Sequence, residues 1–221
     1  MRVGTWNLAG RWSEEHHQLL READCDIWLL TEVNERTEID GHWRHLGTSL
    51  MAARRRWAGV YSRVPLVALP DPHPASATAM VDGTSCCSTI LPWRSCGTRP
   101  PWVGVLHADK TAAALDDLLR VLPPDNLVWG GDWNHALSGR EYSGSVGGRR
   151  HVLNAVERLN LQIPTAELPH RIDALLSIDH IAVGRGQAVR GAQRIPAQGM
   201  SDHDAYVVEL EPADARQGES T

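Results

Sequence analysis

The stretch Leu127-Val128-Trp129-Gly130-Gly131-Asp132-Trp133-Asn134-His135 joins an apolar run to a carboxylate and a carboxamide two residues apart. Side chains alternate along a strand, so Asp132 and Asn134 are predicted to share one face while Trp133 points to the other. Polar groups at the point where a buried strand enters a loop often build an active site. The same residues are also typical of a simple Asx-rich turn. The choice between these interpretations depends on the rest of the chain.

Composition limits the possible classes of protein. The 221 residues include 22 Lys and Arg and 27 Asp and Glu, a formal net charge of −5, which argues against a tight non-specific nucleic-acid binder but not against an enzyme. The N-terminus lacks the apolar core of a signal peptide, and no apolar run approaches the ~20 residues that span a bilayer. The four cysteines do not form a secreted disulfide pattern. We therefore expect a cytoplasmic protein with reduced thiols and no membrane span.

The pattern of apolar residues and turn signals predicts alternating strands and helices. Helices are predicted near 13–23, 110–122 and 149–160, with a loop at 139–148. Two strand-rich halves with flanking helices indicate an α/β protein with two packed sheets. We expect one domain over 1–211 and a polar C-terminal tail over 212–221. Predicted strands, besides the opening stretch, are 2–9, 26–33, 57–61, 66–69, 77–81, 102–107, 177–183 and 205–210.

Polar residues recur where these predicted strands end. One carboxylate at a strand end is usually just solvated, but eight such positions along one chain indicate a common site. They are Asn7, Glu32, His107, Asp132, Asn134, Asp179, Asp202 and His203.

With these residues in order, the chain resembles the endonuclease/exonuclease/phosphatase superfamily. That group contains pancreatic deoxyribonuclease, exonuclease III-type enzymes, neutral sphingomyelinases and inositol polyphosphate phosphatases. The resemblance implies a four-layer α/β/β/α sandwich, in which two mixed sheets are flanked by helices and the site lies at the lip between the sheets. The matching motifs are Thr-Trp-Asn-Leu at 5–8, Leu-Leu-Thr-Glu-Val at 29–33, Gly-Asp-Trp-Asn at 131–134, Ile-Asp-His-Ile at 178–181 and Ser-Asp-His at 201–203.

The resemblance implies a metal site. Glu32 would be the principal ligand of a Mg²⁺ or Mn²⁺ ion, because hard divalent cations prefer carboxylate and water oxygens. Asn7 and Asp202 would complete or support this site, Asn7 partly by orienting its neighbours.

The resemblance also implies roles in catalysis. His203, supported by Asp179, would act as a general base or as an electrostatic partner of the phosphate. Asp132 would orient or deprotonate the attacking water, and Asn134 would hydrogen-bond a phosphoryl oxygen. His107 would stabilise charge that develops on the phosphoryl oxygens.

The chain departs from relatives around His107. Abasic-site endonucleases of the superfamily have a tyrosine there, whereas the deoxyribonuclease and sphingomyelinase branches have histidine. In the deoxyribonuclease that histidine interacts with a nearby glutamate. The comparable stretch here has Arg54, Arg55 and Arg56 instead. These arginines are interpreted either as a solvated loop or as substrate-phosphate contacts. Tyr142 and His135 would line the pocket.

Three functions follow from these residues. The first is a metal-dependent phosphodiesterase, a nuclease with weak sequence preference that acts as a monomer on nucleic acid without a protein partner. The second is a phosphatase or phosphodiesterase that acts on a small phosphorylated metabolite or a lipid head group. The third is a catalytically silent binding module, which the retained charges disfavour because they would repel one another in a shared pocket.

Overall fold

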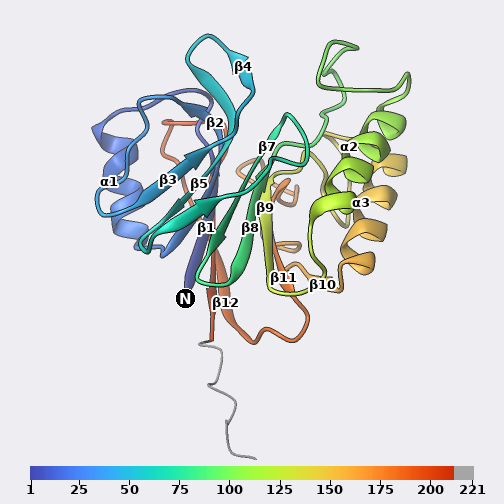
Figure 1. Ribbon diagram of the computed structural model, residues 1–221. Coiled ribbons are helices and arrows are strands. Elements are labelled where there is room, and N and C mark those ends of the chain that lie inside the picture. The colour runs from blue at the N-terminus through green and yellow to red at the C-terminus, as the bar shows by residue number, and fades with distance from the viewer. Residues whose placement is uncertain (212–221) are drawn as a thin grey trace, which may run out of the picture.

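Two parallel strands, β1 (Arg2–Asn7) and β2 (Ile27–Asn34), form the centre of the first sheet in the computed structural model, which describes residues 1–211. The helix α1 (Glu14–Ala23) connects them, and Asn7 pairs with Thr31 in their register. Because both strands run in the same direction, they bring Asn7 and Glu32 to the same end of the sheet. This end lies opposite the N-terminus in Figure 1.

The first sheet has seven strands in the order β12-β13-β1-β2-β5-β3, and β4 also pairs with β5. Apart from the β1–β2 pair its strands are antiparallel. The added strands are β3 (Trp43–Leu46), β4 (Leu50–Ala52), β5 (Arg55–Ser62), β12 (Val189–Ile195) and β13 (Ala205–Leu210).

The second sheet has six strands in the order β10-β11-β9-β8-β7-β6. Only β8 and β9 are parallel, and Asp132 at the end of β9 stands opposite Asp179 at the start of β11. The pairing therefore places two predicted site carboxylates side by side. Its strands are β6 (Leu66–Ala68), β7 (Ser76–Val81), β8 (Thr84–Thr89), β9 (Leu127–Asp132), β10 (Leu161–Gln162) and β11 (Asp179–Gly184).

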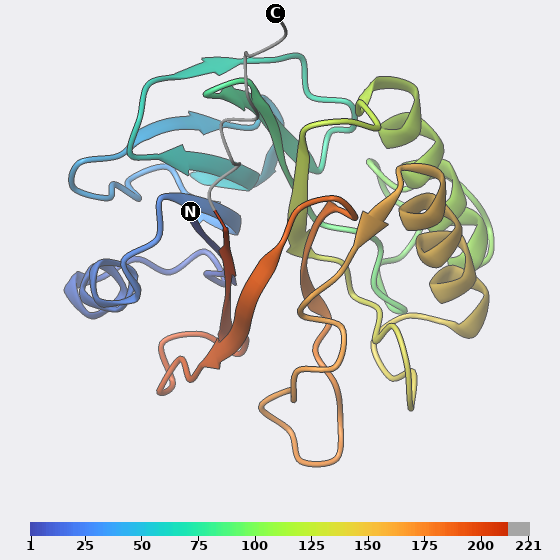
Figure 2. The ribbon, with the colours of Figure 1, turned by 90° about the horizontal axis from the view of Figure 1, so that it is seen from below.

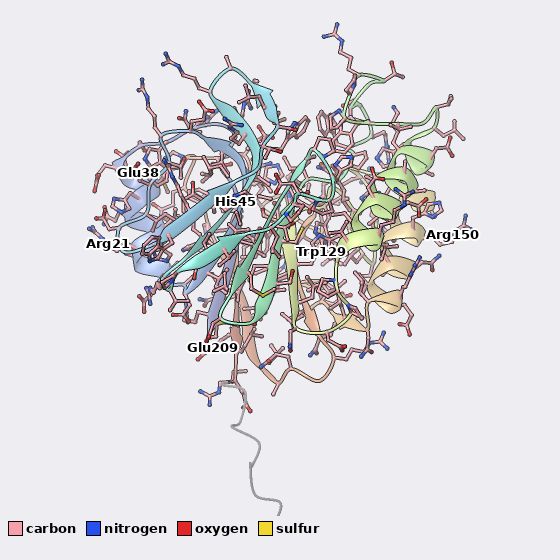
Figure 3. The ribbon with its side chains drawn as sticks, in the orientation of Figure 1. Arg21, Glu38, His45, Trp129, Arg150 and Glu209 are labelled. Atoms are coloured by element: carbon pink, nitrogen blue, oxygen red, sulfur yellow. The ribbon has the colours of Figure 1, made fainter. Side chains whose placement is uncertain are left out.

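The two sheets pack face to face, and helices cover their outer faces (Figures 1 and 2). Leu29 and Val128 belong to the core between the sheets, whereas Leu30 packs in the core under α1. Trp129 packs in a third core beneath α2 (His107–Val121) and α3 (Val146–Arg158). Figure 3 shows Trp129 inside the molecule and Arg150 projecting from its outer side. The predicted four-layer α/β/β/α sandwich is confirmed.

One predicted strand is wrong. Residues 102–107 form no strand, because Val103 and Val105 are 70% and 84% exposed and have no core to pack against. The chain instead enters α2 at His107, where the Asp109 carboxylate accepts the Leu106 backbone N–H at 3.0 Å. The predicted tail, 212–221, lies outside the described residues. Across residues 1–211, no helix has both the length and the apolar character required to cross a bilayer.

Candidate active site

Asn7 connects carboxylates that come from both sheets. Its Nδ2 donates to Asp132 Oδ2 at 3.0 Å and to Glu32 Oε1 at 3.3 Å. Its Oδ1 accepts the backbone N–H of Ala9 at 2.9 Å, which fixes the amide in the loop after β1. Asn7 therefore presents N–H donors to its two acidic neighbours and orients them.

Glu32 stands in an unusual backbone conformation. Its φ of +49° lies in the left-handed region, which is costly for a non-glycine residue and is typical of functional positions. The Gly10 N–H donates to its carbonyl at 2.8 Å and ties β2 to the loop after β1. The Glu32 side chain is 20% exposed, so solvent and small ions can reach it.

The turn after β9 is both an Asx turn and part of the site. Asp132 Oδ1 accepts the Asn134 backbone N–H at 3.1 Å, as in an Asx turn. The Asn134 side chain donates to the Leu91 carbonyl at 3.1 Å and accepts from the Ser143 hydroxyl at 2.9 Å. These bonds fix the Asp132 and Asn134 side chains in place, so the two interpretations of this stretch are compatible.

His203 lies between two carboxylates. Its Nδ1 is 2.7 Å from Asp179 Oδ2, and its Nε2 is 3.9 Å from Asp132 Oδ2. The Ser201 hydroxyl accepts the His203 backbone N–H at 3.1 Å and donates to the Asn7 carbonyl at 2.6 Å. The Trp6 indole donates to the His203 carbonyl at 2.9 Å. The loop before β13 is therefore attached to the end of β1.

The charges of this cluster are strongly coupled. Burial raises the pKa of Asp132 to about 7, and Asp179 and Glu32 add to this rise while His203 and Asn7 oppose it. Burial alone would lower the pKa of His203, but the Asp179 and Asp132 carboxylates outweigh it and raise the pKa to about 10. At neutral pH the histidine is therefore a cation. Asp132 is the better-suited proton acceptor, because a base works best when its pKa is close to the working pH.

Two groups of residues offer atoms to a metal ion. Ligand atoms of Asp132, Asp179 and His203 lie within 4.8 Å of one another. This group suits a hard cation poorly, because a protonated imidazole has no lone pair to give and its positive charge already pairs with the carboxylates. The partly exposed Glu32 carboxylate, oriented by Asn7, has the oxygen chemistry that Mg²⁺ and Mn²⁺ prefer. Asp202 is exposed on the loop attached to Asn7 and contacts the Ser201 hydroxyl at 3.5 Å.

His107 is not brought into this cluster. Its Nδ1 pairs with the Ser145 hydroxyl at 2.9 Å and its Nε2 with the Pro92 carbonyl at 2.8 Å. Both ring nitrogens are thus occupied at the start of α2, and the ring packs against the buried His135. The sequence motif suggested a strand end, but the exposed segment before it does not pair with the sheet. No described contact joins His107 to Asp132, Asp179 or His203.

The three predicted arginines separate. Arg54 is exposed in the turn before β5, and Arg56 pairs with Glu35 at 2.7 Å. Arg55 alone reaches the site, with Nη1 2.5 Å from Glu32 Oε2. Tyr142 donates to the Leu176 carbonyl at 2.9 Å and stacks edge-on against His170.

Two further arginines flank the loop that carries Asp202 and His203. Arg11 donates to the Met200 carbonyl at 3.2 Å, and Arg171 donates to the Ser201 carbonyl at 3.3 Å. Both side chains belong to exposed residues. The position of Arg11, four residues after Asn7 in the sequence, could have indicated that it lies near the site. Nothing in the sequence indicated this for Arg171, because its loop reaches the site only through tertiary packing.

The fold and site define a class: a two-sheet sandwich with acids and a paired histidine at the lip. The family model "Endonuclease/Exonuclease/phosphatase family" matches residues 4–203. The chain therefore belongs to this family, and it is a hydrolase that acts on phosphoester bonds. No curated protein sequence matches it.

Solved structures share the fold at low sequence identity. The endonuclease domain of TRAS1, a telomere-specific non-LTR retrotransposon, is 16% identical with a TM-score of 0.68, over 96% of this chain and 99% of that one. The AP endonuclease LMAP from Leishmania major is 18% identical with a TM-score of 0.66, over 96% and 88%. An endonuclease/exonuclease/phosphatase from Beutenbergia cavernae is 16% identical with a TM-score of 0.69, over 95% and 71%.

Proposed function

We propose that this protein is a divalent-metal-dependent phosphodiesterase, most specifically a nuclease with weak sequence preference. The observation that carries the proposal is the cluster in which Asn7 joins Glu32 to Asp132 while His203 lies between Asp132 and Asp179. Converging carboxylates repel one another unless cations neutralise them. Three carboxylates, Glu32, Asp132 and Asp179, meet two cations, His203 and Arg55, so negative charge remains for a metal at the partly exposed Glu32.

In the proposed mechanism each residue has one task. Glu32 would hold Mg²⁺ or Mn²⁺, with Asn7 and Asp202 in support, and such an ion would supply positive charge beside the phosphoryl oxygens. Asp132 orients the attacking water and accepts its proton. The imidazolium of His203, held by Asp179, stabilises negative charge that develops on phosphorus oxygens. Asn134 donates its second amide hydrogen to a phosphoryl oxygen. The mechanism does not use His107.

Nucleic acid is the favoured substrate. Exposed Arg11, Arg54 and Arg171 offer phosphate contacts despite the net charge of −5, because the field that matters is the local one. Such contacts to the backbone carry little sequence information. Two of the solved structures that share this fold are named as endonucleases.

Hydrolysis of a small phosphate ester is the second candidate. Small ligands are usually bound in a main cavity. Two cavities of about 370 and 360 Å³ lie elsewhere, one lined by residues such as Gln18 and Met200 and the other by residues such as Asn126 and Gln187. None of the proposed catalytic or metal residues lines either cavity, so neither of these two cavities supports binding of a small ester at the proposed site.

The deciding experiment is a substrate panel. Purified protein would be incubated with plasmid, single-stranded DNA, RNA and a small phosphate ester, with Mg²⁺, with Mn²⁺ and with excess EDTA. We expect metal-dependent cleavage of a polynucleotide. Faster turnover of the small ester than of any polynucleotide would replace the nuclease proposal with the second candidate. We also propose that the protein acts as a monomer, and that it lies in the cytoplasm, which the four free cysteine thiols support.

A further inference from the structure

Arg55 already engages the carboxylate that is proposed to hold the metal. Its Nη1 lies 2.5 Å from Glu32 Oε2, while the Asn7 amide donates to Glu32 Oε1 at 3.3 Å. Both oxygens of the glutamate therefore accept hydrogen bonds from protein donors. The pair is only partly buried, with 34% of the Arg55 side chain and 20% of the Glu32 side chain exposed.

The Arg55 side chain packs directly against Gly10. A Cβ added to Gly10 would lie 2.8 Å from Arg55 Cδ and 3.0 Å from Arg55 Nε, so only glycine leaves room for the arginine in this position. Gly10 has a φ of +71°, so its backbone also favours glycine. Gly10 is tied to β2 because its N–H donates to the Glu32 carbonyl and its carbonyl accepts from Asn34 Nδ2. The arginine thus packs on a fixed loop beside the site.

Its neighbours in the sequence have no such position. Arg56 is engaged by Glu35 and by the carbonyls of Gly47 and Thr48. Arg54 is exposed in the turn. A role for Arg55 therefore follows from its contacts and not from its membership of a basic run.

A guanidinium and a divalent cation cannot both pair closely with one carboxylate without repelling each other. A metal that binds Glu32 must weaken or displace the Arg55 contact. The displaced guanidinium remains beside the site and offers a planar set of donors, which matches a phosphate well.

We propose that Arg55 is an internal counter-ion of Glu32 that the divalent metal displaces, and that the displaced guanidinium then binds the substrate phosphate. The proposal rests on the metal-dependent function proposed above. Arg55 balances the charge of Glu32 before a metal binds. Metal binding is therefore weaker than it would be without Arg55, and substrate binding is tighter.

The first test measures metal binding without substrate. Mn²⁺ would be titrated calorimetrically into the wild type, Arg55→Gln and the matched control Arg54→Gln. We expect Arg55→Gln to bind Mn²⁺ about tenfold more tightly, about 1.4 kcal/mol, and Arg54→Gln to match the wild type within about twofold. Equal affinities in all three proteins would overturn the counter-ion role. Absence of Mn²⁺ binding in all three would instead overturn the proposed metal-dependent function.

The second test separates charge from packing. Arg55→Lys keeps the positive charge without the planar fork, so its Mn²⁺ affinity should stay near that of the wild type while its KM for a DNA duplex rises. At saturating Mn²⁺ we expect Arg55→Gln to raise this KM about tenfold and to change kcat by less than about threefold. An unchanged KM in Arg55→Gln would overturn the phosphate-binding half of the proposal. Circular dichroism and thermal melting would establish that each variant is folded, and Arg55→Lys provides the test if Arg55→Gln is not.

Discussion

His203 and Asp179 form a close charged pair in the cluster, with Nδ1 and Oδ2 2.7 Å apart. Asp179 is fully buried at the start of β11, and the described residues offer no partner to its Oδ1. The other ring nitrogen of His203 faces Asp132 at 3.9 Å. Asp179 therefore fixes the orientation and charge of the imidazole that faces Asp132.

Removing either member of this pair should reduce catalysis. We expect His203→Ala and Asp179→Asn each to lower kcat by ~10²–10³-fold, the usual contribution of a group that stabilises charge in the transition state, with little change in KM. Because the two residues act as one unit, the double variant should lose little more than the worse single variant. Steady-state kinetics on the preferred polynucleotide would measure this. A double variant whose loss equals the product of the two single losses would show that the residues act independently.

Much of the fold was predictable from apolar runs. The buried strands β1, β2, β9 and β13 carry Val, Leu, Ile or Trp on their buried faces, and β2 begins with four consecutive apolar residues. The chain around β8 was harder, because its Thr, Ser and Cys residues resemble a loop although they are almost all buried. The edge strand β12 mixes small and apolar residues with Arg and Gln, and none of its residues is fully buried, so it gave no clear apolar pattern. In contrast, Val103 and Val105 resemble a strand but are exposed.

The sequence indicated which residues belong to the candidate site better than it indicated their charges and ion pairs. Strand ends and motifs indicated Asp132, Asp179 and His203, which the two sheets bring together. Sequence could not show that Arg55 pairs with Glu32, because that contact depends on the β2–β5 register and on the space above Gly10. Likewise, the positive charge of His203 depends on two carboxylates that are close only in the folded chain.

Metal dependence should be visible in binding as well as in activity. Glu32→Gln keeps the size of the side chain but removes its charge, so Mn²⁺ binding should weaken by at least about tenfold, or ~1.4 kcal/mol. Calorimetric titration would measure this, and unfolding curves would check the fold. Excess EDTA should abolish cleavage by the wild type. Full activity in EDTA, or unchanged Mn²⁺ affinity in the variant, would contradict the assignment of Glu32.

Salt should weaken binding of nucleic acid through released counterions. Each lost phosphate contact reduces the slope of log affinity against log salt by roughly 0.7–0.9. We expect this change for Arg54→Ala, because Arg54 is exposed in the turn directly before Arg55, which contacts Glu32. Arg190→Ala is the matched control, since Arg190 pairs with Glu211 at the opposite end of the sheet. Affinity measured over a salt series would test this, and equal slopes for both variants would exclude a phosphate contact by Arg54.

Two buried histidines should make the fold sensitive to acid. Burial lowers the pKa of His135 and of His180 to about 4, below the ~6.5 of an unfolded histidine. Between these pKa values the unfolded chain therefore binds more protons than the folded chain. The free energy of unfolding should be highest above about pH 6.5 and should fall as the pH drops toward 4.

Urea unfolding at several pH values would measure this loss. His135→Asn keeps a donor for the Trp133 carbonyl but cannot take up the proton. The slope of its free energy of unfolding against pH should therefore be smaller by up to ~1.4 kcal/mol per pH unit. His151→Asn, a partly exposed position on α3, is the control and should keep the wild-type slope. If His135→Asn also keeps it, protonation of His135 does not drive the loss.

Gly131 is the position where the fold and the site depend on each other most directly. Its φ is +125°, and an added Cβ would lie 2.2 Å from the Thr89 carbonyl oxygen on the adjoining strand. Gly131→Ala therefore combines backbone strain with a clash against backbone atoms, and we expect it to lower the free energy of unfolding by at least about 2 kcal/mol. Gly184→Ala is the matched control at the far end of β11, where an added Cβ meets nothing within 4 Å, and it should change stability by less than about 0.5 kcal/mol. Urea unfolding of both variants would test this. Because Asp132 follows Gly131 directly, a folded Gly131→Ala protein should also lose activity, and a variant as stable and active as the wild type would show that β9 does not need this close approach.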